Sequence, residues 1–582
     1  MSDGDQTTGE MSDGLQVELF HPDSDREPGD TNIEKWGFDV HPVVFPVALV
    51  IIALFIAATI ILGEDASAAY TWLFNFIGEN FGWFYLLAVN IFIVALLFFA
   101  FSKYGKIRIG GVGAEKEFSD FSWMAMLFSA GMGIGLMFFS VSEPLYYFQN
   151  VPGFFGAEAE TGAAGSAAIA QTFFHWGFHP WAVYGLVGLG LAFFSFNRGL
   201  PLTFRSIFWP LLGDRIYGWP GHVIDLVTVF ATLFGLATSL GLGVAQVNQG
   251  ISYVGGNMLG LMDVGTGTTQ QVILIAGITL IATASVAAGL DSGVKRLSTI
   301  NLYLMFLLLG FLLLVGPTVY ALGAWVEGLG VYFNNILGLG FYRGTLGPGG
   351  GTVTAWTVFY WGWWIAWSPF VGMFIARISK GRTVREFVLG VLFLPSLFST
   401  LWLSVFGGSA LFNSIQGNGA AIQTYNELGQ TVAMFAMLEQ FPLGALSGIL
   451  ATVLVITFFV TSSDSGSLVI DHLTSGGKHD VPRAQRIFWA VTEGAVAAIL
   501  LYGGGLGALQ TAAITTGLPF AVILCLMVYT VHQGLSNEYE ILQSEAFSER
   551  IEDLTAEGDV DVVRSGTDTV TDLREGDSPS GD

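Results

Sequence analysis

Long apolar segments alternate with short polar ones through the middle of the chain. Twelve of them approach or exceed the roughly 20 residues that a helix needs to cross a bilayer. Their approximate ranges are 42–63, 81–102, 121–148, 165–195, 222–254, 271–289, 299–322, 354–377, 385–411, 444–471, 485–503 and 508–532. The pattern predicts an all-α polytopic membrane protein with twelve transmembrane helices. The first segment follows a polar, acidic leader, which indicates a membrane span and not a cleavable signal peptide.

Positive charge marks one side of the predicted bundle. Sixteen of the seventeen Lys and Arg residues between positions 41 and 533 follow even-numbered segments, and only Arg343 follows an odd-numbered one. Cytoplasmic loops carry such an excess in membrane proteins. The asymmetry supports the count of twelve and predicts a cell-membrane protein with both termini in the cytoplasm.

Composition narrows the class of protein. Only 12% of the 582 residues are charged and 52% are hydrophobic, about half the charged share of a soluble domain, which argues against a soluble enzyme. The net charge of −24 would repel nucleic acid. The single cysteine, Cys525, cannot form an internal disulfide or a zinc cluster, and no cofactor is expected.

The negative charge is concentrated at the two ends. Residues 1–40 hold 11 acids and 2 bases, and residues 534–582 hold 14 acids and 3 bases. We therefore expect acidic, solvated and disordered cytoplasmic tails over 1–40 and 534–582, flanking a twelve-helix core over 41–533. Such acidity also suits a high-salt cytoplasm and favours a halophilic source; an ordinary acidic tail is the alternative.

Two of the segments contain helix-breaking residues. The third has glycines at 131, 133 and 135, each costing about 1 kcal/mol of helix propensity relative to alanine, and the eighth has Ser368-Pro369. We expect both helices to be interrupted, although close helix packing is another use of the glycines. Interruptions five segments apart predict two inverted five-helix repeats, spans 3–7 and 8–12.

Aromatic residues crowd the fourth and eighth segments. Trp176, Trp181 and Tyr184 share one helical face, and five tryptophans fall within residues 356–367. There the spacing predicts that Trp363 stacks on Trp367 while Trp364 turns away. An interfacial belt is the alternative, but it needs only one or two rings at each end of a span.

An aromatic cage of this kind suits a quaternary ammonium group, which is attracted to ring faces and donates no hydrogen bonds. A zwitterion also needs donors for its carboxylate. Backbone N–H groups freed by the glycine interruption, at Gly131, Met132 and Gly133, are the candidates.

The run from Trp356 to Gly372, WTVFYWGWWIAWSPFVG, and the run from His175 to Tyr184, HWGFHPWAVY, resemble the betaine/carnitine/choline transporter family over about residues 40–533. The resemblance implies a twelve-helix inverted-repeat fold of the amino-acid/sodium symporter type, commonly a trimer. It also implies that Trp176, Trp181, Tyr184 and Trp364 hold the substrate. Trp363 and Trp367 would line the exit path.

Two hydroxyls in the tenth segment, at Thr461 and Ser462, are candidate sodium ligands; bonding back to their own helix is the alternative. The resemblance adds main-chain oxygens of Ser129, Met132 and Phe458. It also implies a second sodium site that would include Thr232 and Phe370, but Leu236 stands where sodium-coupled members tend to have a second threonine.

Proton coupling is the rival mechanism. Proton-coupled choline members tend to carry an aspartate where this chain has Gly135, which favours sodium and a net-neutral substrate. His175 and His179 lack an evident third metal ligand, and Glu143 and Asp464 are expected to cap or pair structurally.

The residues and the resemblance together predict sodium-coupled, alternating-access uptake of a trimethylammonium osmolyte, most favourably glycine betaine, by a membrane protein that is not an enzyme. The resemblance implies that this protein is a homotrimer. Proton-coupled or exchange transport of choline or carnitine is the alternative, and a channel or receptor is more remote. The acidic C-terminal tail predicts no lipid-attached osmosensor, and truncation after Ser536 is expected to leave transport unchanged.

Overall fold

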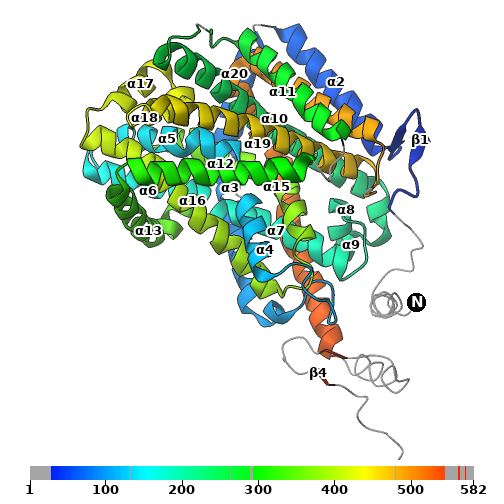
Figure 1. Cartoon of the computed structure of the whole chain (residues 1–582). Coiled ribbons are helices and arrows are strands. Elements are labelled where there is room, and N and C mark those ends of the chain that lie inside the picture. The colour runs from blue at the N-terminus through cyan, green and yellow to red at the C-terminus, as the bar shows by residue number, and fades with distance from the viewer. Residues whose placement is uncertain are drawn as a thin grey trace, which may run out of the picture.

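The computed structural model describes residues 28–63, 65–130, 133–262, 264–288, 293–478 and 480–543, with two short pairs of strand residues beyond them. Helices make up most of this part of the chain (Figure 1). Two strands precede the first described helix, β1 (Ile33–Lys35) and β2 (Phe38–Val40), and they pair antiparallel. The two strands near the C-terminus are β3 (Val562–Val563) and β4 (Val570–Thr571).

The helices of the first half of the chain are α2 (Val44–Leu62), α3 (Asp65–Phe101), η1 (Lys103–Lys106), α4 (Asp120–Ala130), α5 (Ile134–Gln149), α6 (Gly162–Trp176), α7 (Phe178–Phe196), α8 (Phe204–Ile207), α9 (Trp209–Leu212), η2 (Gly213–Tyr217), α10 (Trp219–Ser252) and η3 (Tyr253–Met258). Those of the second half are α11 (Thr268–Ala288), α12 (Gly293–Val315), α13 (Thr318–Phe341), α14 (Gly350–Thr352), η4 (Val353–Val358), α15 (Phe359–Arg377), α16 (Val384–Ile415), α17 (Ala420–Leu428), η5 (Gln430–Val432), α18 (Ala433–Leu438), α19 (Gly444–Thr474) and α20 (Arg483–Gln543).

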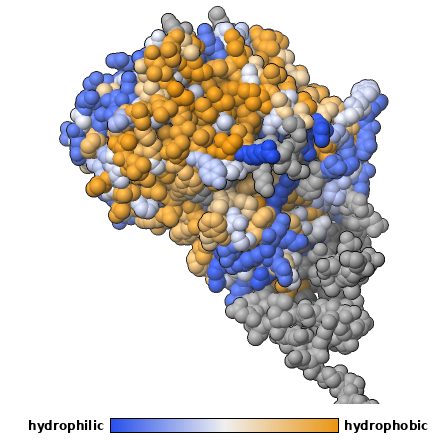
Figure 2. All heavy atoms as spheres, in the orientation of Figure 1, coloured by the Kyte–Doolittle hydropathy of each residue, from blue (hydrophilic) through white to orange (hydrophobic). Residues whose placement is uncertain are grey.

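Nine helical stretches within the described residues are long and apolar enough to cross a membrane. Figure 2 shows a broad hydrophobic surface on the face where α12 lies, with hydrophilic residues gathered toward its edges. Apolar side chains of α12 such as Phe306, Leu307 and Leu314 are exposed there. Such a surface suits contact with lipid, and the chain is a multi-pass membrane protein.

The described residues contain nine such stretches where twelve spans were predicted, mainly because some predicted spans are merged into one helix and others are split between two. α20 covers the last two predicted spans in one element, but its backbone is non-helical at Gly504 and Gly505, between those spans. The third predicted span is divided between α4 and α5. The count of twelve and the repeat arrangement stay predictions.

The glycine run of the third segment separates two helices. α4 ends at Ala130 and α5 begins at Ile134, with Gly133 in an extended conformation (φ −171°, ψ −172°). The fourth segment is also divided, because α6 ends at Trp176 and α7 begins at Phe178. These two breaks place helix ends in the middle of the bundle.

The expected interruption at Ser368-Pro369 is wrong, because α15 runs through it to Arg377. Proline lacks the N–H that would bond to the carbonyl of Ile365 four residues earlier. The Ser368 hydroxyl donates to that carbonyl instead, at 2.7 Å. The lost backbone bond is thereby replaced, and the helix continues.

Two other helical regions were not foreseen. The predicted span 299–322 ends early, at Val315, and α13 follows where a loop was expected. Gly328 lets α13 approach α6 closely, since a Cβ there would lie 2.4 Å from a methyl group of Ile169. The short helices α17 and α18 were missed as well.

The expected disorder of residues 1–40 is wrong for their last part, because β1 pairs with β2 and β2 packs against α20. The Asp39 carboxylate accepts hydrogen bonds from Asn32 at 2.8 Å and from Lys478 at 2.5 Å. The backbone N–H of Asp39 donates to the side-chain oxygen of Gln485 at 2.9 Å. The bond to Asp39 also raises the pKa of Lys478. Residues 1–27 lie outside the described residues.

The expected C-terminal tail begins inside a packed helix. α20 continues to Gln543, and Glu538 forms a buried ion pair with Arg198. Truncation after Ser536 would leave that arginine without its carboxylate. The expectation that everything after Ser536 is dispensable is therefore corrected to a boundary beyond Gln543.

Candidate functional site

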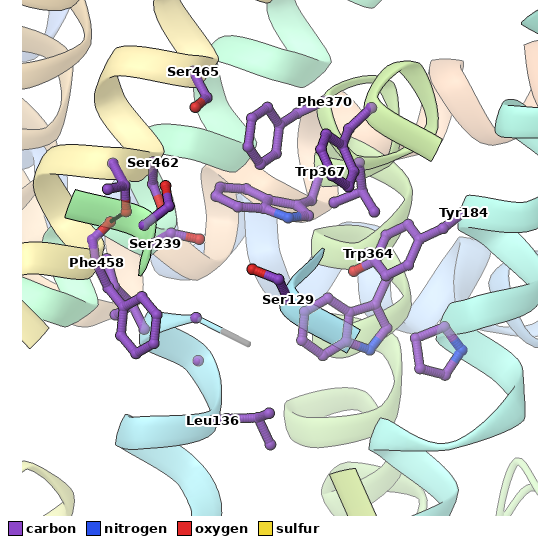
Figure 3. Close-up of a pocket in the computed structure, with 18 of the residues that line it drawn as sticks. Ser129, Leu136, Tyr184, Ser239, Trp364, Trp367, Phe370, Phe458, Ser462 and Ser465 are labelled. Carbon is purple, nitrogen blue, oxygen red and sulfur yellow. Dashed lines mark hydrogen bonds between the residues drawn. The ribbon is translucent and has the colours of Figure 1, made fainter. Parts of the chain in front are cut away.

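A cavity of about 300 Å³ lies where the break between α4 and α5 meets α7, α15 and α19, at the lower end of the usual size of small-molecule sites. One side, which we name the aromatic wall, consists of Trp176, Trp181, Tyr184, Trp363, Trp364, Trp367 and Phe370. The other, the hydroxyl wall, consists of Ser129, Ser239, Ser298, Asn301, Thr461, Ser462 and Ser465. In Figure 3, Trp364 and Ser462 lie on either side of Ser129.

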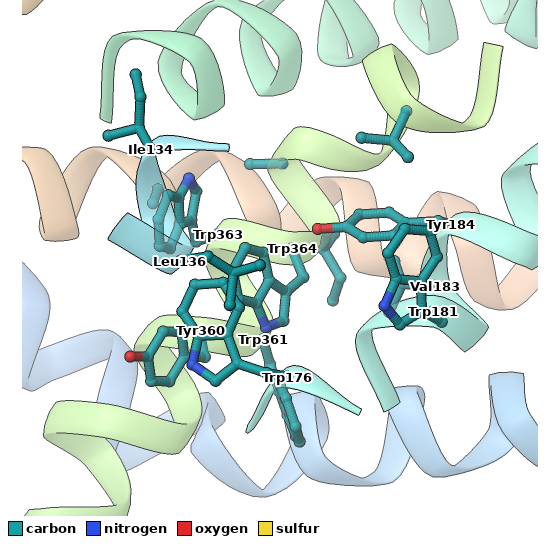
Figure 4. Packing of buried hydrophobic residues seen from close by; sticks show 14 of the residues in the cluster. Ile134, Leu136, Trp176, Trp181, Val183, Tyr184, Tyr360, Trp361, Trp363 and Trp364 are labelled. Carbon is teal, nitrogen blue, oxygen red and sulfur yellow. The ribbon is translucent and has the colours of Figure 1, made fainter. Parts of the chain in front are cut away.

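Four rings of the aromatic wall meet nearly at right angles. The ring centroids of Trp176 and Trp364 are 4.8 Å apart at 71°, and those of Tyr184 and Trp364 are 6.4 Å apart at 78°. Trp181 meets Tyr184 at 5.3 Å and 82°. Figure 4 shows Trp176 and Trp364 beside each other, with the Tyr184 hydroxyl directed toward them. The break at Gly177 allows α6 and α7 to contribute rings to the same cage.

The predicted stacking of Trp363 on Trp367, with Trp364 turned away, is wrong. Trp363 stacks on its neighbour Trp364, with centroids 4.6 Å apart at 18°, and Trp364 faces the cage. The indole N–H of Trp363 donates to Ser239 at 3.2 Å, and that of Trp364 donates to the carbonyl of His175 at 3.0 Å. These two bonds orient the adjacent rings in parallel. Trp367 lies beside Phe370 instead, at 5.1 Å.

The residues of the glycine run lie beside the cage as far as the structure describes them. Gly133 and Gly135 line the cavity, whereas Gly131 and Met132 lie outside the described residues. The first N–H groups of α5 have no partner within their own helix, so this helix end can offer donors to an anion. A Cβ on Gly135 would lie 2.8 Å from the Trp176 ring and 2.9 Å from the Trp363 ring.

The predicted sodium residues Ser129, Phe458, Thr461 and Ser462 all line the cavity. Here the Thr461 hydroxyl contacts the carbonyls of Thr457 at 3.1 Å and Phe458 at 3.2 Å. It also accepts a hydrogen bond from Asn301 at 3.2 Å. The bond to its own helix, which was the alternative interpretation, is thus present in this structure.

The residues of the weaker sodium site are not brought together on the cavity surface. Phe370 lines the cavity, but Thr232 is not among the described residues that do. The Thr232 hydroxyl is fully buried and donates to the carbonyl of Thr228 at 2.7 Å. Leu236 packs against Gly466 of α19, where a Cβ would approach it to 2.4 Å.

Glu143 and His175 form a buried pair behind the aromatic wall, with Oε1 and Nδ1 2.6 Å apart. His179 does not join this pair: its ring stacks on Trp361, with ring centroids 5.6 Å apart and an angle of 11° between the ring planes. Within the described residues, no group of three His, Cys, Asp or Glu side chains could hold a metal ion. Asp464 accepts a hydrogen bond from Ser285 at 2.9 Å.

Several cavity residues were not predicted, namely Ser239, Ser298, Asn301 and Arg377. Asn301 and Ser239 are polar residues inside apolar segments, and this signal could have identified them. Arg377 is the one charged side chain among the described residues that line the cavity, and no carboxylate lines it. A cation in this cavity would therefore meet ring faces and not an acidic partner.

A cavity at broken helices within a membrane-embedded bundle is typical of a transporter. Comparison with known proteins agrees: residues 43–540 match the family model described as BCCT, betaine/carnitine/choline family transporter. The chain belongs to this family of transporters, and it is not an enzyme.

Individual relatives cover most of the chain. It is 48% identical to glycine betaine transporter 1 of Vibrio parahaemolyticus over 90% of this chain and 99% of the relative. It is 44% identical to a glycine betaine/proline/choline transporter of the same organism, over 89% of this chain and 94% of the relative. The identity to a glycine betaine transporter of Acinetobacter baylyi is 41%, over 85% of this chain and 74% of the relative.

Proposed function

We propose that this chain takes up a trimethylammonium osmolyte, with glycine betaine the favoured substrate, by sodium symport with alternating access. The observation that carries the proposal is the set of near-perpendicular rings of Trp176, Trp181, Tyr184 and Trp364 around a cavity whose described lining has no carboxylate. A trimethylammonium group is attracted to such faces and needs no hydrogen-bond acceptor.

The rest of a betaine molecule also finds suitable partners. Its carboxylate would accept hydrogen bonds from backbone N–H groups at the start of α5, beside Gly133. Gly135 leaves this part of the cavity without an acidic side chain, which favours a substrate with no net charge. Relatives named as glycine betaine transporters support the same choice.

Sodium coupling rests on the hydroxyl wall. Ser129, Phe458, Thr461 and Ser462 all line the cavity, and hydroxyl and carbonyl oxygens of such residues suit sodium in transporters. The Thr461 hydroxyl donates to its own helix and accepts from Asn301, so an ion would use its remaining lone pair or displace Asn301. A second sodium ion at Thr232 and Phe370 receives less support, because the Thr232 hydroxyl is bonded to its own helix.

Further parts of the proposal concern the whole molecule. They are two inverted five-helix repeats, cytoplasmic termini in a halophile's cell membrane, a homotrimer in contact with lipid, and a role in osmoregulation. Most Lys and Arg residues of the core follow even-numbered predicted spans, which supports a cytoplasmic position for both termini.

Uptake into proteoliposomes tests the proposal. Labelled glycine betaine, choline and carnitine are offered under an imposed sodium gradient, an imposed proton gradient, or neither. We expect uphill accumulation of glycine betaine with sodium alone. Accumulation with protons alone would favour the choline or carnitine alternative, exchange without a gradient would indicate an antiporter, and downhill flux without accumulation would indicate a channel.

A further inference from the structure

The Glu143 carboxylate lies fully buried in α5, behind the aromatic wall and not among the cavity-lining residues. Its Oε2 accepts hydrogen bonds from the indole N–H of Trp176 at 2.9 Å and from the hydroxyl of Tyr360 at 2.6 Å. Its Oε1 lies 2.6 Å from Nδ1 of His175. A buried carboxylate is tolerated where donors of this kind surround it.

Each of these partners leads to a ring of the cage. Trp176 is itself a cage ring, and Tyr360 stacks on Trp364 with centroids 5.5 Å apart at 15°. The main chain of His175 accepts the indole N–H of Trp364 at 3.0 Å. The Glu143 carboxylate thus restrains both Trp176 and Trp364, whose rings meet edge to face with centroids 4.8 Å apart.

The hydrogen bond to Trp176 also has an electronic effect. An indole N–H that donates to a carboxylate is polarised, and electron density shifts toward the ring. A ring face with more electron density attracts a cation more strongly. Glu143 can therefore strengthen the attraction without entering the cavity, where a carboxylate would hold a cation directly.

We propose that Glu143 is a positioning residue for the ammonium cage, which fixes Trp176 and Tyr360 and strengthens the ring face that Trp176 offers to the substrate. This inference rests on the proposed function, because it presupposes a cationic group in the cavity. Its chemistry differs from an ordinary structural ion pair, which would hold the helices together and leave substrate affinity unchanged.

The test measures the Kd for labelled glycine betaine at fixed sodium concentration, using purified full-length protein in liposomes. The variants are Glu143→Gln, Trp176→Phe and the double variant, because phenylalanine keeps a ring but has no N–H. We expect Glu143→Gln to raise Kd about threefold to tenfold, the range for losing one ordinary hydrogen bond, because the amide oxygen of glutamine can still accept from one donor. With Phe at position 176, the same change should raise Kd only about twofold, through Tyr360 alone.

Glu327→Gln is the matched control, since this exposed glutamate of α13 accepts a hydrogen bond from Ser166 far from the cage network. It should leave Kd unchanged. An unchanged Kd in Glu143→Gln would overturn the inference. So would a Glu143→Gln effect on Kd that is equally large with Trp and with Phe at position 176, because the inference requires the two residues to be coupled.

If Glu143→Gln does not fold, Tyr360→Phe keeps the inference testable, because it removes a single hydroxyl donor to Glu143. A roughly threefold rise in Kd is expected, and no rise would contradict the inference. Failure of the proposed function looks different: the unsubstituted protein itself would then bind no glycine betaine.

Discussion

The two walls of the cavity hold their polar atoms in opposite ways. On the aromatic wall, the indole N–H groups of Trp176, Trp363 and Trp364 donate to Glu143, Ser239 and the His175 carbonyl, so these rings are fixed before any ligand arrives. On the hydroxyl wall, Thr461 bonds to the backbone of its own helix and to Asn301.

The difference separates a preorganised surface from one that can rearrange. The aromatic wall presents ring faces whose neighbours are already satisfied, so a bound ammonium group costs it little reorganisation. On the hydroxyl wall, the Asn301 amide occupies one acceptor position of the Thr461 hydroxyl, and an ion that takes this position displaces it. We therefore expect sodium binding to move Asn301, whereas the cage stays nearly the same.

The largest expected effect comes from removing both hydroxyls. Thr461→Ala together with Ser462→Ala should lower the sodium stimulation of glycine betaine uptake at least tenfold (about 1.4 kcal/mol or more of coupling), while weak sodium-independent binding persists. The measurement is uptake into proteoliposomes against sodium concentration. Thr457→Ala is the control, since that hydroxyl is bonded to Val453 and does not line the described cavity. Full sodium stimulation in the double variant would place the ion elsewhere.

A smaller effect is expected from the preorganised wall. Trp364→Leu and Trp176→Leu keep an apolar side chain but lose the ring quadrupole, at a cost of roughly 0.5 to 2 kcal/mol each. Kd for glycine betaine should rise about twofold to thirtyfold while sodium dependence is retained. Trp219→Leu, at an exposed tryptophan, serves as the control in the same binding assay. If both cage variants bound glycine betaine as tightly as the unsubstituted protein, the substrate would bind at another place.

Gly135 tests how closely the wall is packed. Gly135→Ala would place a methyl group within 3 Å of the Trp176 and Trp363 rings, and their displacement should raise Kd about fivefold, a cost near 1 kcal/mol. Gly330→Ala in α13 is the control, because nothing lies within 4 Å of a Cβ there and the residue does not line the described cavity. Similar Kd values for both alanine variants would contradict the rigid-wall interpretation.

The smallest effect on either wall is expected from the acidic C-terminal tail. Truncation after Gln543 should leave uptake, and any activation by hyperosmotic shock, within about twofold of the full chain, since it removes neither wall nor any basic lipid-binding segment. Uptake with and without osmotic shock measures this. Loss of activation would show that the tail senses osmotic stress.

Truncation after Ser536 provides the contrast, because it also removes Glu538. Leaving the buried Arg198 unpaired should lower the free energy of unfolding by about 3 kcal/mol. A lower melting temperature than that of the Gln543 truncation is the expected result. Equal melting temperatures would show that the ion pair contributes nothing.

The sequence was most informative where periodicity or composition acts locally. Apolar length located most membrane-spanning helices, and the glycine run marked the break before Ile134. Trp176, Trp181 and Tyr184 do line one cavity, but the helical wheel assumed a continuous helix, whereas Trp176 ends α6 and the other two rings lie in α7. Their role in binding stays a prediction.

Long-range contacts explain most of what was missed. The stacking of Trp363 on Trp364 depends on Ser239 and His175, which lie on other helices. The continuity of α15 is a local exception, because the Ser368 hydroxyl bonds to Ile365 only three residues away. The order of residues 33–40 depends on Gln485 and Lys478, more than 400 positions away. Local patterns carry no information about such partners.

The central claim is that ring faces recognise the positive charge of the substrate. It is tested most directly by comparing the binding of glycine betaine with that of 3,3-dimethylbutanoate, which replaces the ammonium nitrogen by carbon and keeps the shape and the carboxylate. Competition against labelled glycine betaine on the unsubstituted protein gives both affinities. The account predicts that this analogue, which lacks the positive charge, binds at least tenfold more weakly, since a desolvated cation–π contact contributes about 2 kcal/mol. Equal affinity would show that the cage selects by shape alone and would contradict the claim.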